Sequence, residues 1–250
     1  MKARFILTPI VLMVALSIIL SSCTDAVNKL ATAAVNHQFQ FEREDSVKWG
    51  KLVERTCNLP DFTALDVDGV ICLVYTQDSV CSVRIRGNEK CLEAYNVGMN
   101  EDELKVSLKE RNGKINDNTP AIILYVSAPV LKEVEFSGGG KVEMRGQIEM
   151  PGKLAVELNG ATNFVADSMA VGSLELETNG ASKCSIAKLE TIGNVEIEVN
   201  GAGDIDANVF CQDLRIEMNG AGKGTFSGEC KKLVCEENGA SKIDFSKLKR

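Results

Sequence analysis

The chain has 250 residues, of which 44% are hydrophobic, and a formal net charge of −7 from 28 Lys and Arg against 35 Asp and Glu. An acidic chain without a basic cluster lacks the feature with which proteins bind phosphate backbones, which argues against nucleic acid as a partner. The one histidine, His37, leaves the rest of the chain without the base that a Ser-His-Asp or Cys-His arrangement needs, so we predict no catalytic residues and no enzyme.

The N-terminus has the pattern of an export signal. Lys2 and Arg4 precede an apolar run at 5–20, and Leu20-Ser21-Ser22 leads to Cys23. The run is shorter than the roughly 20 residues that cross a bilayer, so residues 1–22 are predicted to be a signal peptide and not a membrane span. The residues before Cys23 resemble the lipobox of bacterial lipoproteins. This resemblance implies lipidation of Cys23, a membrane anchor and a place in the cell envelope, at the outer membrane, on its periplasmic or its outer face.

Strand-like runs without a fixed period follow a polar segment. Residues 23–51 lack sustained alternation and are predicted to be a tether. Residues 52–130 are expected to form irregular coils that open and cap a repetitive domain. The predicted strands are 70–75 and 80–86, paired through a turn at 76–79, and 104–108 and 121–126, separated by a polar loop at 109–119.

The tripeptide Asn-Gly-Ala recurs five times in the C-terminal half and predicts a repetitive fold. A period of 19 to 22 residues is typical of one coil of a β-solenoid. With the degenerate corner at Ser137-Gly138-Gly139, residues 131–250 are predicted to form six regular repeats of a solenoid domain that spans 52–250. Because Asn-Gly readily supplies consecutive residues with positive φ, each tripeptide is predicted to be a tight corner between two short strands. The corner asparagines are Asn159, Asn179, Asn200, Asn219 and Asn238.

Apolar residues alternate with polar ones on both sides of the corners. Val156 and Leu158 precede Asn159, for example, and Phe164 and Ala166 follow it. A period of two indicates strands that are buried on one face. The predicted fold class is therefore all-β, a parallel β-solenoid with two short strands per coil.

A glutamate lies two residues before every corner. Equivalent residues on stacked coils lie about 4.8 Å apart, so these carboxylates are predicted to form a ladder. In water, the repulsion between neighbours is under about 1 kcal/mol, which a solvated face tolerates. The alternative is that the ladder binds a divalent cation or a basic partner surface. The ladder residues are Glu135, Glu157, Glu177, Glu198, Glu217 and Glu236, with lysines four residues after four of the corners at Lys141, Lys183, Lys223 and Lys242.

Eight cysteines remain after Cys23, an even number that suits an oxidising compartment. Cys211 and Cys230 each lie eight residues before a corner, so they are expected on adjacent coils as a candidate disulfide. Cys184 and Cys235 occupy inward positions and are expected to be buried thiols. No Cys-x-x-Cys pair occurs, so no metal site and no cofactor are predicted. The pairing of Cys57, Cys72, Cys81 and Cys91 stays open.

The pattern Phe62-x-x-Leu65-x-Val67-x-Gly69, the strands after it, Ala128-Pro129-x-Leu131 and the corner glycines resemble the auto-transporter adhesin, head GIN domain family over about 53–245. The resemblance implies a right-handed, pectin-lyase-like β-helix with glycine-small-glycine turns and a role in adhesion. Gly201-Ala202-Gly203 and Gly220-Ala221-Gly222 match that turn best.

Two functions follow as hypotheses. The first is a non-catalytic, lipid-anchored cell-envelope protein that presents a rigid β-face for adhesion or surface assembly, with a glycan or a cell-surface molecule as ligand. The second is a polysaccharide-binding or polysaccharide-processing β-helix protein, which the low aromatic content of 5% disfavours because few rings are left to stack on sugars. A homo-oligomer would share every sequence feature of the first.

Overall fold

The computed structural model describes residues 46–109 and 121–250. The predicted signal peptide, the lipidation site Cys23, His37, most of the predicted tether and most of the polar loop at 109–119 lie outside the described residues. Within the described ranges, no helix is long and apolar enough to cross a membrane.

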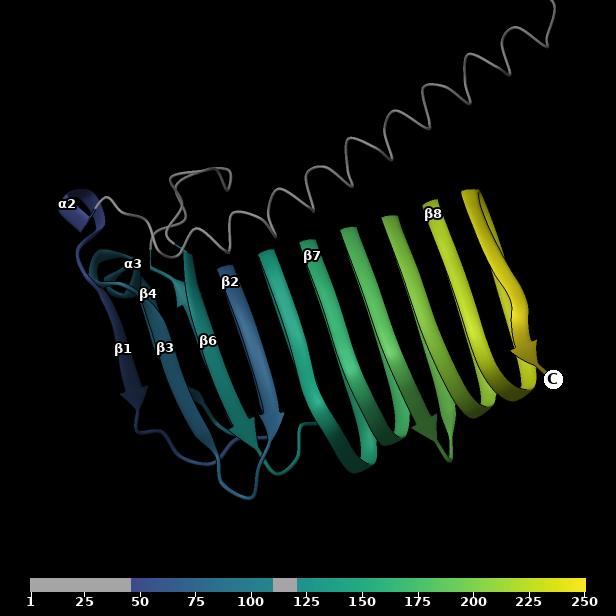
Figure 1. The fold of residues 1–250 in the computed structure, drawn as a ribbon, viewed down its shortest axis with the longest axis horizontal. Helices are drawn as coiled ribbons and strands as arrows, with labels where there is room; N and C mark the ends of the chain where they lie inside the picture. The colour runs from purple at the N-terminus through teal and green to yellow at the C-terminus, as the bar shows by residue number, and fades with distance from the viewer. Residues whose placement is uncertain (1–45, 110–120) are drawn as a thin grey trace, which may run out of the picture.

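The protein is all-β, with one sheet that curls along the length of the molecule (Figure 1). Among the described residues, two short helices lie near the N-terminal end, and two very long strands make up the repetitive half. In chain order the elements are α2 (Ser46–Trp49), β1 (Leu52–Cys57), β2 (Ala64–Gln77), β3 (Ser82–Asn88), α3 (Glu89–Glu93), β4 (Tyr95–Asn100), β5 (Glu103–Leu108), β6 (Ala121–Ala128), β7 (Glu133–Thr191) and β8 (Asn194–Lys249).

Parallel pairing in register keeps equivalent residues of successive segments side by side. β2 pairs with β7 so that Gly69 lies opposite Gly138, and β7 pairs with β8 so that Gly180 lies opposite Gly201. Figure 1 shows β7 and β8 bending repeatedly as the chain advances along the long axis of the molecule. Each sequence position of the repeat therefore becomes a column that runs along the sheet.

The corners differ from the expectation of two short strands per coil. β7 and β8 run through them without leaving the sheet, over 59 and 56 residues. Within each Asn-Gly-Ala tripeptide only the glycine has a positive φ, +132° at Gly180, and Glu101 is the sole non-glycine residue of the described chain with one. A Cβ at Gly180 would lie 2.5 Å from the carbonyl oxygen of Gly160, so this glycine is needed both for its φ and for close stacking. The asparagine before it stays extended and has another role.

The alternating apolar residues point inward, as predicted. Val156, Leu158, Phe164 and Ala166 are all at most 2% exposed and belong to one continuous core. Thr178 occupies an inward position in place of an aliphatic residue. Its buried hydroxyl has no hydrogen-bond partner, which is costly in an apolar interior.

The N-terminal region forms the predicted strands but not the predicted hairpin. β2 and β3 are not neighbours, because β6 lies between them, parallel to β2 and antiparallel to β3. Consecutive strands pair more often than not, which is why the hairpin was expected. Here β2 is in register with β7 on one edge and with β5 and β6 on the other, so neither edge is left for β3.

Tyr95, at the start of β4, closes the N-terminal end of the glycine column. Its hydroxyl accepts a hydrogen bond from the Val70 amide at 2.9 Å and donates one to the Val70 carbonyl at 3.2 Å. A Cβ at Gly69 would lie 2.7 Å from the Tyr95 ring. The tyrosine thus fills the place in which a preceding coil would put its own corner.

Candidate binding surface

The glutamates that precede the corners are aligned on neighbouring segments, as the ladder hypothesis requires. Glu177 lies opposite Glu198, and Glu135 lies opposite Asp66 of β2. Asp66 thus extends the column by one carboxylate toward the N-terminus. Sequence reasoning missed it because β2 carries Asp68-Gly69 at its corner and not Asn-Gly-Ala.

The corner asparagines form a second ladder beside the glutamates. The Asn179 side-chain amide donates to the Asn159 side-chain carbonyl at 3.1 Å and to Glu177 Oε1 at 2.9 Å. Asn200 repeats both bonds, to Asn179 at 3.1 Å and Glu198 at 2.8 Å. Sequence reasoning took these asparagines for turn residues only, although their invariant spacing from the glutamates was a usable signal. The six glutamates and five asparagines are called the carboxylate–amide face below.

Neutral amides and one arginine offset the repulsion along the glutamate column. An amide donor on a carboxylate gives a charge-assisted hydrogen bond, which stabilises the ionised form. Arg215 lies within 3.3 Å of Glu196, 3.6 Å of Glu217 and 3.7 Å of Glu236, and so bridges three segments. The lysines after the corners do not pair with this column within the described residues; Lys141, for example, pairs with Glu143.

The N-terminal end of the column is the least compensated. Burial raises the pKa of Glu135, and the neighbouring carboxylates of Asp66 and Glu157 raise it further. Lys105 forms an ion pair with Asp66 and acts in the opposite direction on Glu135. Ionised Glu135 therefore lowers the free energy of unfolding.

A hollow of about 650 Å³ opens on this face where the ladder begins. Glu157 and Glu177 of the ladder line it, together with Lys132, Lys153 and Glu175. Lys153 pairs with Glu175 across it. The hollow thus presents both signs of charge beside the carboxylates, which suits a polar ligand better than an apolar one.

The described residues contain no group of three or more His, Cys, Asp or Glu side chains that could hold a metal ion. One oxygen of most ladder glutamates already accepts an asparagine amide, as at Glu157 and Glu217. Cation binding by the ladder stays a prediction.

The eight cysteines of the described chain are free thiols, including Cys211 and Cys230. The predicted disulfide is thus not formed in this structure and stays a prediction; both residues line the same groove. Burial raises the pKa of Cys211 to about 11 and that of Cys184 to about 12, and Cys230 adds to the effect at Cys211. Such thiols are protonated at neutral pH and are poor nucleophiles. Cys184 is buried as predicted, whereas Cys235 on the last segment is half-buried.

Solved structures share this fold. The crystal structure of a "putative adhesin" from Bacteroides fragilis NCTC 9343 aligns with a TM-score of 0.61 and 19% identity over 80% of this chain and 97% of that one. Two further such structures, from Parabacteroides distasonis ATCC 8503 and Parabacteroides merdae ATCC 43184, give TM-scores of 0.52 and 0.51 at 15% and 18% identity, with the same coverage. A comparison with curated proteins finds no matching sequence.

The family comparison agrees with the motifs and the corner glycines. The model described as "Putative auto-transporter adhesin, head GIN domain" matches residues 61–188 and 185–250, which is most of the chain. The chain therefore belongs to the auto-transporter adhesin, head GIN domain family.

Proposed function

We propose that this chain is a non-catalytic, lipid-anchored protein of the cell envelope that presents its carboxylate–amide face for adhesion or surface assembly. Membership of an adhesin-like family supports a role at the envelope or cell surface. The observation that carries the proposal is the double ladder. Its glutamates and asparagines repeat at each segment and are held in place by each other, for example at Asn200, which bonds to both Asn179 and Glu198.

A preorganised, repetitive polar face suits a repetitive or extended ligand. The hydrogen bonds along the ladder fix the side chains before binding, so little conformational entropy is lost on contact. The column of carboxylates favours a basic or polyhydroxylated ligand surface. Each contact is weak, but a repeat of contacts along one rigid face multiplies the affinity.

The solenoid architecture is part of the proposal. We infer that the curled sheet is a parallel, right-handed β-helix of the pectin-lyase type, which the parallel register of β2, β7 and β8 supports. Such a frame supplies no catalytic groups itself but holds a long face rigid. The absence of histidine between residues 46 and 250, and thiols whose pKa values are raised, favour binding over catalysis.

Anchoring through Cys23 at the outer membrane is proposed from the signal-peptide pattern. Replacing Cys23 by serine is expected to release the chain from the membrane fraction. Protease treatment of intact cells then tests exposure on the outer face. A chain that stays protected until the outer membrane is opened would leave surface adhesion without support.

The binding role is tested by removing charge from the face without removing its hydrogen bonds. The variant Glu157→Gln, Glu177→Gln, Glu198→Gln keeps an oxygen for each asparagine amide. Its control is Glu54→Gln, Glu93→Gln, Glu101→Gln, which changes the net charge equally at exposed sites of the N-terminal region.

Binding of both variants and of the native chain is measured on a glycan array and on immobilised polylysine. The native chain and the control are expected to bind alike, and the ladder variant about tenfold more weakly or worse, because several contacts are lost together. Equal binding by all three contradicts the proposal. Cleavage of a uronate polymer in a parallel lyase assay would favour the polysaccharide-processing alternative.

A further inference from the structure

A largely apolar groove of about 570 Å³ runs along a second bend of the sheet, eight residues before the asparagine corners. Five successive segments contribute to it, so that it crosses the strands. Its floor is a column of small and aliphatic residues. The column comprises Pro151, Val171, Cys211 and Cys230, and Ile192, at the equivalent sequence position, projects from it.

Two of the most exposed large apolar side chains of the described residues lie in this groove. Ile192 is 85% exposed and Phe210 is 38% exposed. The reason is local: the step from Asn179 to Asn200 is 21 residues, whereas the next step is 19. A bulge between Ile186 and Leu189, and the break between β7 and β8 that contains Ile192, take up the extra residues. The extra length pushes Ile192 out of the sheet. Paired exposure of this kind marks an interaction site more often than a single exposed residue does.

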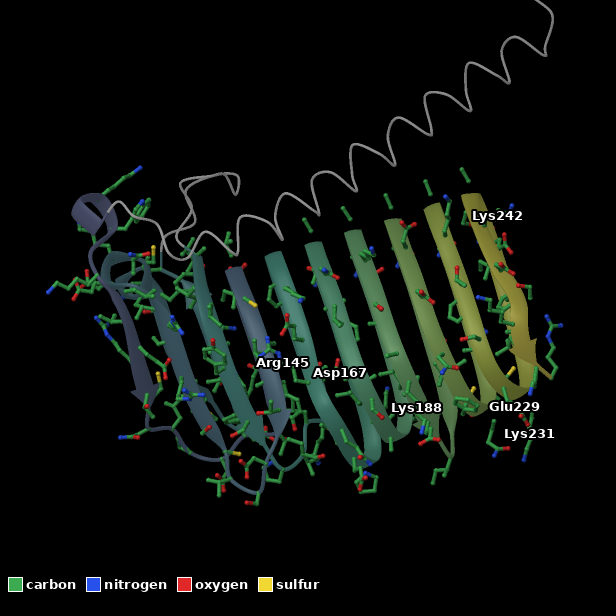
Figure 2. The ribbon with its side chains drawn as sticks, viewed as in Figure 1. Arg145, Asp167, Lys188, Glu229, Lys231 and Lys242 are labelled. Atoms are coloured by element: carbon green, nitrogen blue, oxygen red, sulfur yellow. The ribbon has the colours of Figure 1, made fainter. Side chains whose placement is uncertain are left out.

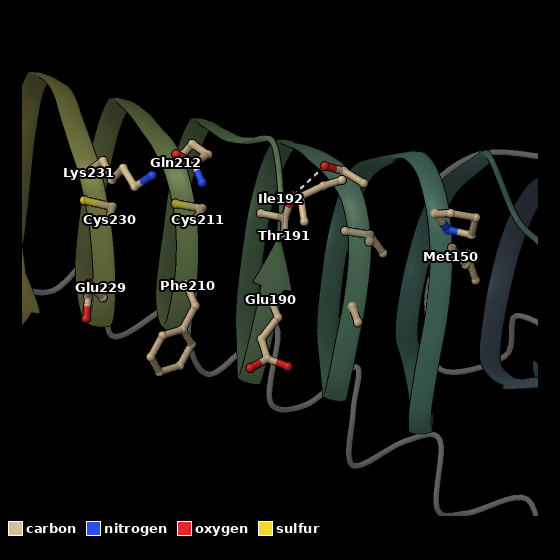
Figure 3. Close-up of a pocket in the computed structure, with 14 residues that line it drawn as sticks. Met150, Glu190, Thr191, Ile192, Phe210, Cys211, Gln212, Glu229, Cys230 and Lys231 are labelled. Carbon is tan, nitrogen blue, oxygen red and sulfur yellow. Dashed lines mark hydrogen bonds between the residues drawn. The ribbon is translucent and has the colours of Figure 1, made fainter.

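The two rims of the groove differ in charge. Figure 3 shows Glu190, Phe210 and Glu229 along one rim, and Gln212 and Lys231 along the other. Glu229 and Lys231 lie near the same bend of the last segments (Figure 2). Neither forms an ion pair with another described residue. Glu190 is paired with Lys188 at 3.0 Å, so the uncompensated rim charges of the groove are Glu229 on one side and Lys231 on the other, with an apolar floor between them.

We propose that this groove is a homodimer interface, closed by the same groove of a second copy about a two-fold axis parallel to it. A two-fold interface is self-complementary, so each patch must fit itself. An axis along the groove places each segment opposite the same segment of the partner and reverses the strand direction. Ile192 then packs against its own counterpart, and each rim faces the other rim of the partner, with Glu229 opposite the partner's Lys231.

The rim charges select this axis over the perpendicular one. A two-fold axis across the groove would reverse the order of the segments, so that Glu229 would lie opposite the first segment of the partner and away from the partner's Lys231. The apolar floor favours another protein surface over a glycan, because Phe210 is the single aromatic residue among those that line it. No ladder glutamate lines the groove, so the carboxylate–amide face stays available and the dimer does not rest on the proposed function.

The interface is short. Five segments at about 4.8 Å spacing span about 19 Å, so the contact is smaller than a standard protein interface. A weak, concentration-dependent dimer is expected.

Cross-linking at the axis tests the geometry. In the full chain with Cys211→Ser and Cys230→Ser, the added change Ile192→Cys is expected to give a disulfide-linked dimer on mild oxidation in membranes. The matched control is Val80→Cys, at an apolar residue that is 65% exposed outside the groove. A dimer band with Ile192→Cys and none above background with Val80→Cys supports the proposal. Equal bands for both variants, or none for either, overturn it.

Sedimentation equilibrium of the full chain then tests the energetics. Ile192→Lys is expected to raise the dimer dissociation constant about tenfold or more, since the largest apolar contact is lost. Glu229→Lys is expected to weaken the dimer, and the exchange Glu229→Lys with Lys231→Glu to restore it, because the rims again face opposite charges. A monomer at every concentration, or a dimer that is indifferent to Ile192→Lys, overturns the proposal; in the first case, the groove would belong to another partner.

Discussion

Replacing Asn200 by aspartate tests whether the amide ladder holds the glutamate column. Asn200 donates to Asn179 at 3.1 Å and to Glu198 at 2.8 Å, and it accepts from Asn219 at 3.1 Å. Ionised aspartate keeps the acceptor but loses both donors. It also places a carboxylate oxygen where an amide now contacts Glu198.

The magnitude follows from two terms. Two lost hydrogen bonds cost about 1–3 kcal/mol together. Two like charges about 3 Å apart add about 1.5 kcal/mol at the dielectric constant of water, and more in a half-buried site. The free energy of unfolding at pH 7 is therefore expected to fall by about 3 kcal/mol or more, a large part of the stability of a typical domain.

The effect should depend on pH with a defined sign. Repulsion from Glu198 raises the pKa of the new carboxyl in the folded chain above its unfolded value. The penalty is then complete above the folded pKa and shrinks as the pH falls toward the unfolded value of about 3.9, where protonated aspartate again donates a hydrogen bond.

Urea denaturation followed by circular dichroism, from pH 7 down to pH 4, measures this effect. Asn200→Ala controls for lost donors without added charge and should show no such recovery. Asn238 is exposed, and its side-chain amide donates one hydrogen bond, to Asn219 at 2.9 Å. Asn238→Asp should therefore lower the free energy of unfolding by less than Asn200→Asp does. A penalty that is equal at both sites, or the same for aspartate and alanine at all pH values, would refute the ladder argument.

Three further substitutions, the first with a control, test other features of the fold. Glu135→Gln should raise the melting temperature at neutral pH and lose this gain below about pH 4.5, because the raised pKa of Glu135 means that its ionised form opposes folding; Glu217→Gln, which gives up contact with Arg215, should show no gain. Thr178→Val should raise the free energy of unfolding by about 1 kcal/mol, since it replaces a buried, unpartnered hydroxyl by a methyl group of similar size. Tyr95→Phe should lower the free energy of unfolding by about 1–3 kcal/mol, because the buried Val70 amide loses its partner. Calorimetry on each variant is the measurement, and a shift of opposite sign would contradict the reasoning in each case.

Much of the repetitive half could be predicted because its sequence repeats. A period of about 20 residues and alternation around each corner placed Val156, Leu158, Phe164 and Ala166 in the core, and the structure confirms all of them. The alignment of the glutamates was predictable for the same reason, since equal spacing along the chain becomes equal height along a stacked sheet. Periodicity depends only on spacing along the chain, so it can be recognised in a single sequence.

The order of the N-terminal strands could not be predicted in this way. Runs of strand-forming residues indicated β2, β3 and β6, but they did not show which strands would be neighbours in the sheet. The sheet places β6 beside β2, and this choice depends on contacts between residues far apart in the chain, such as Ile71 with Ile122. Asp66 joined the glutamate column through the same long-range register.

The sequence by itself determined that this is an all-β, repetitive chain with buried columns, a corner glycine at each turn and a row of carboxylates. Only the tertiary structure decided what the asparagines do, because their bonds join residues about 20 positions apart that meet only when segments stack. It also decided that the strands continue through the corners, and that the extra residues between Asn179 and Asn200 place Ile192 outward at a groove. The physical reason is the same throughout: composition and period act along the chain, whereas hydrogen bonds between side chains and exposed surfaces depend on which segments become neighbours.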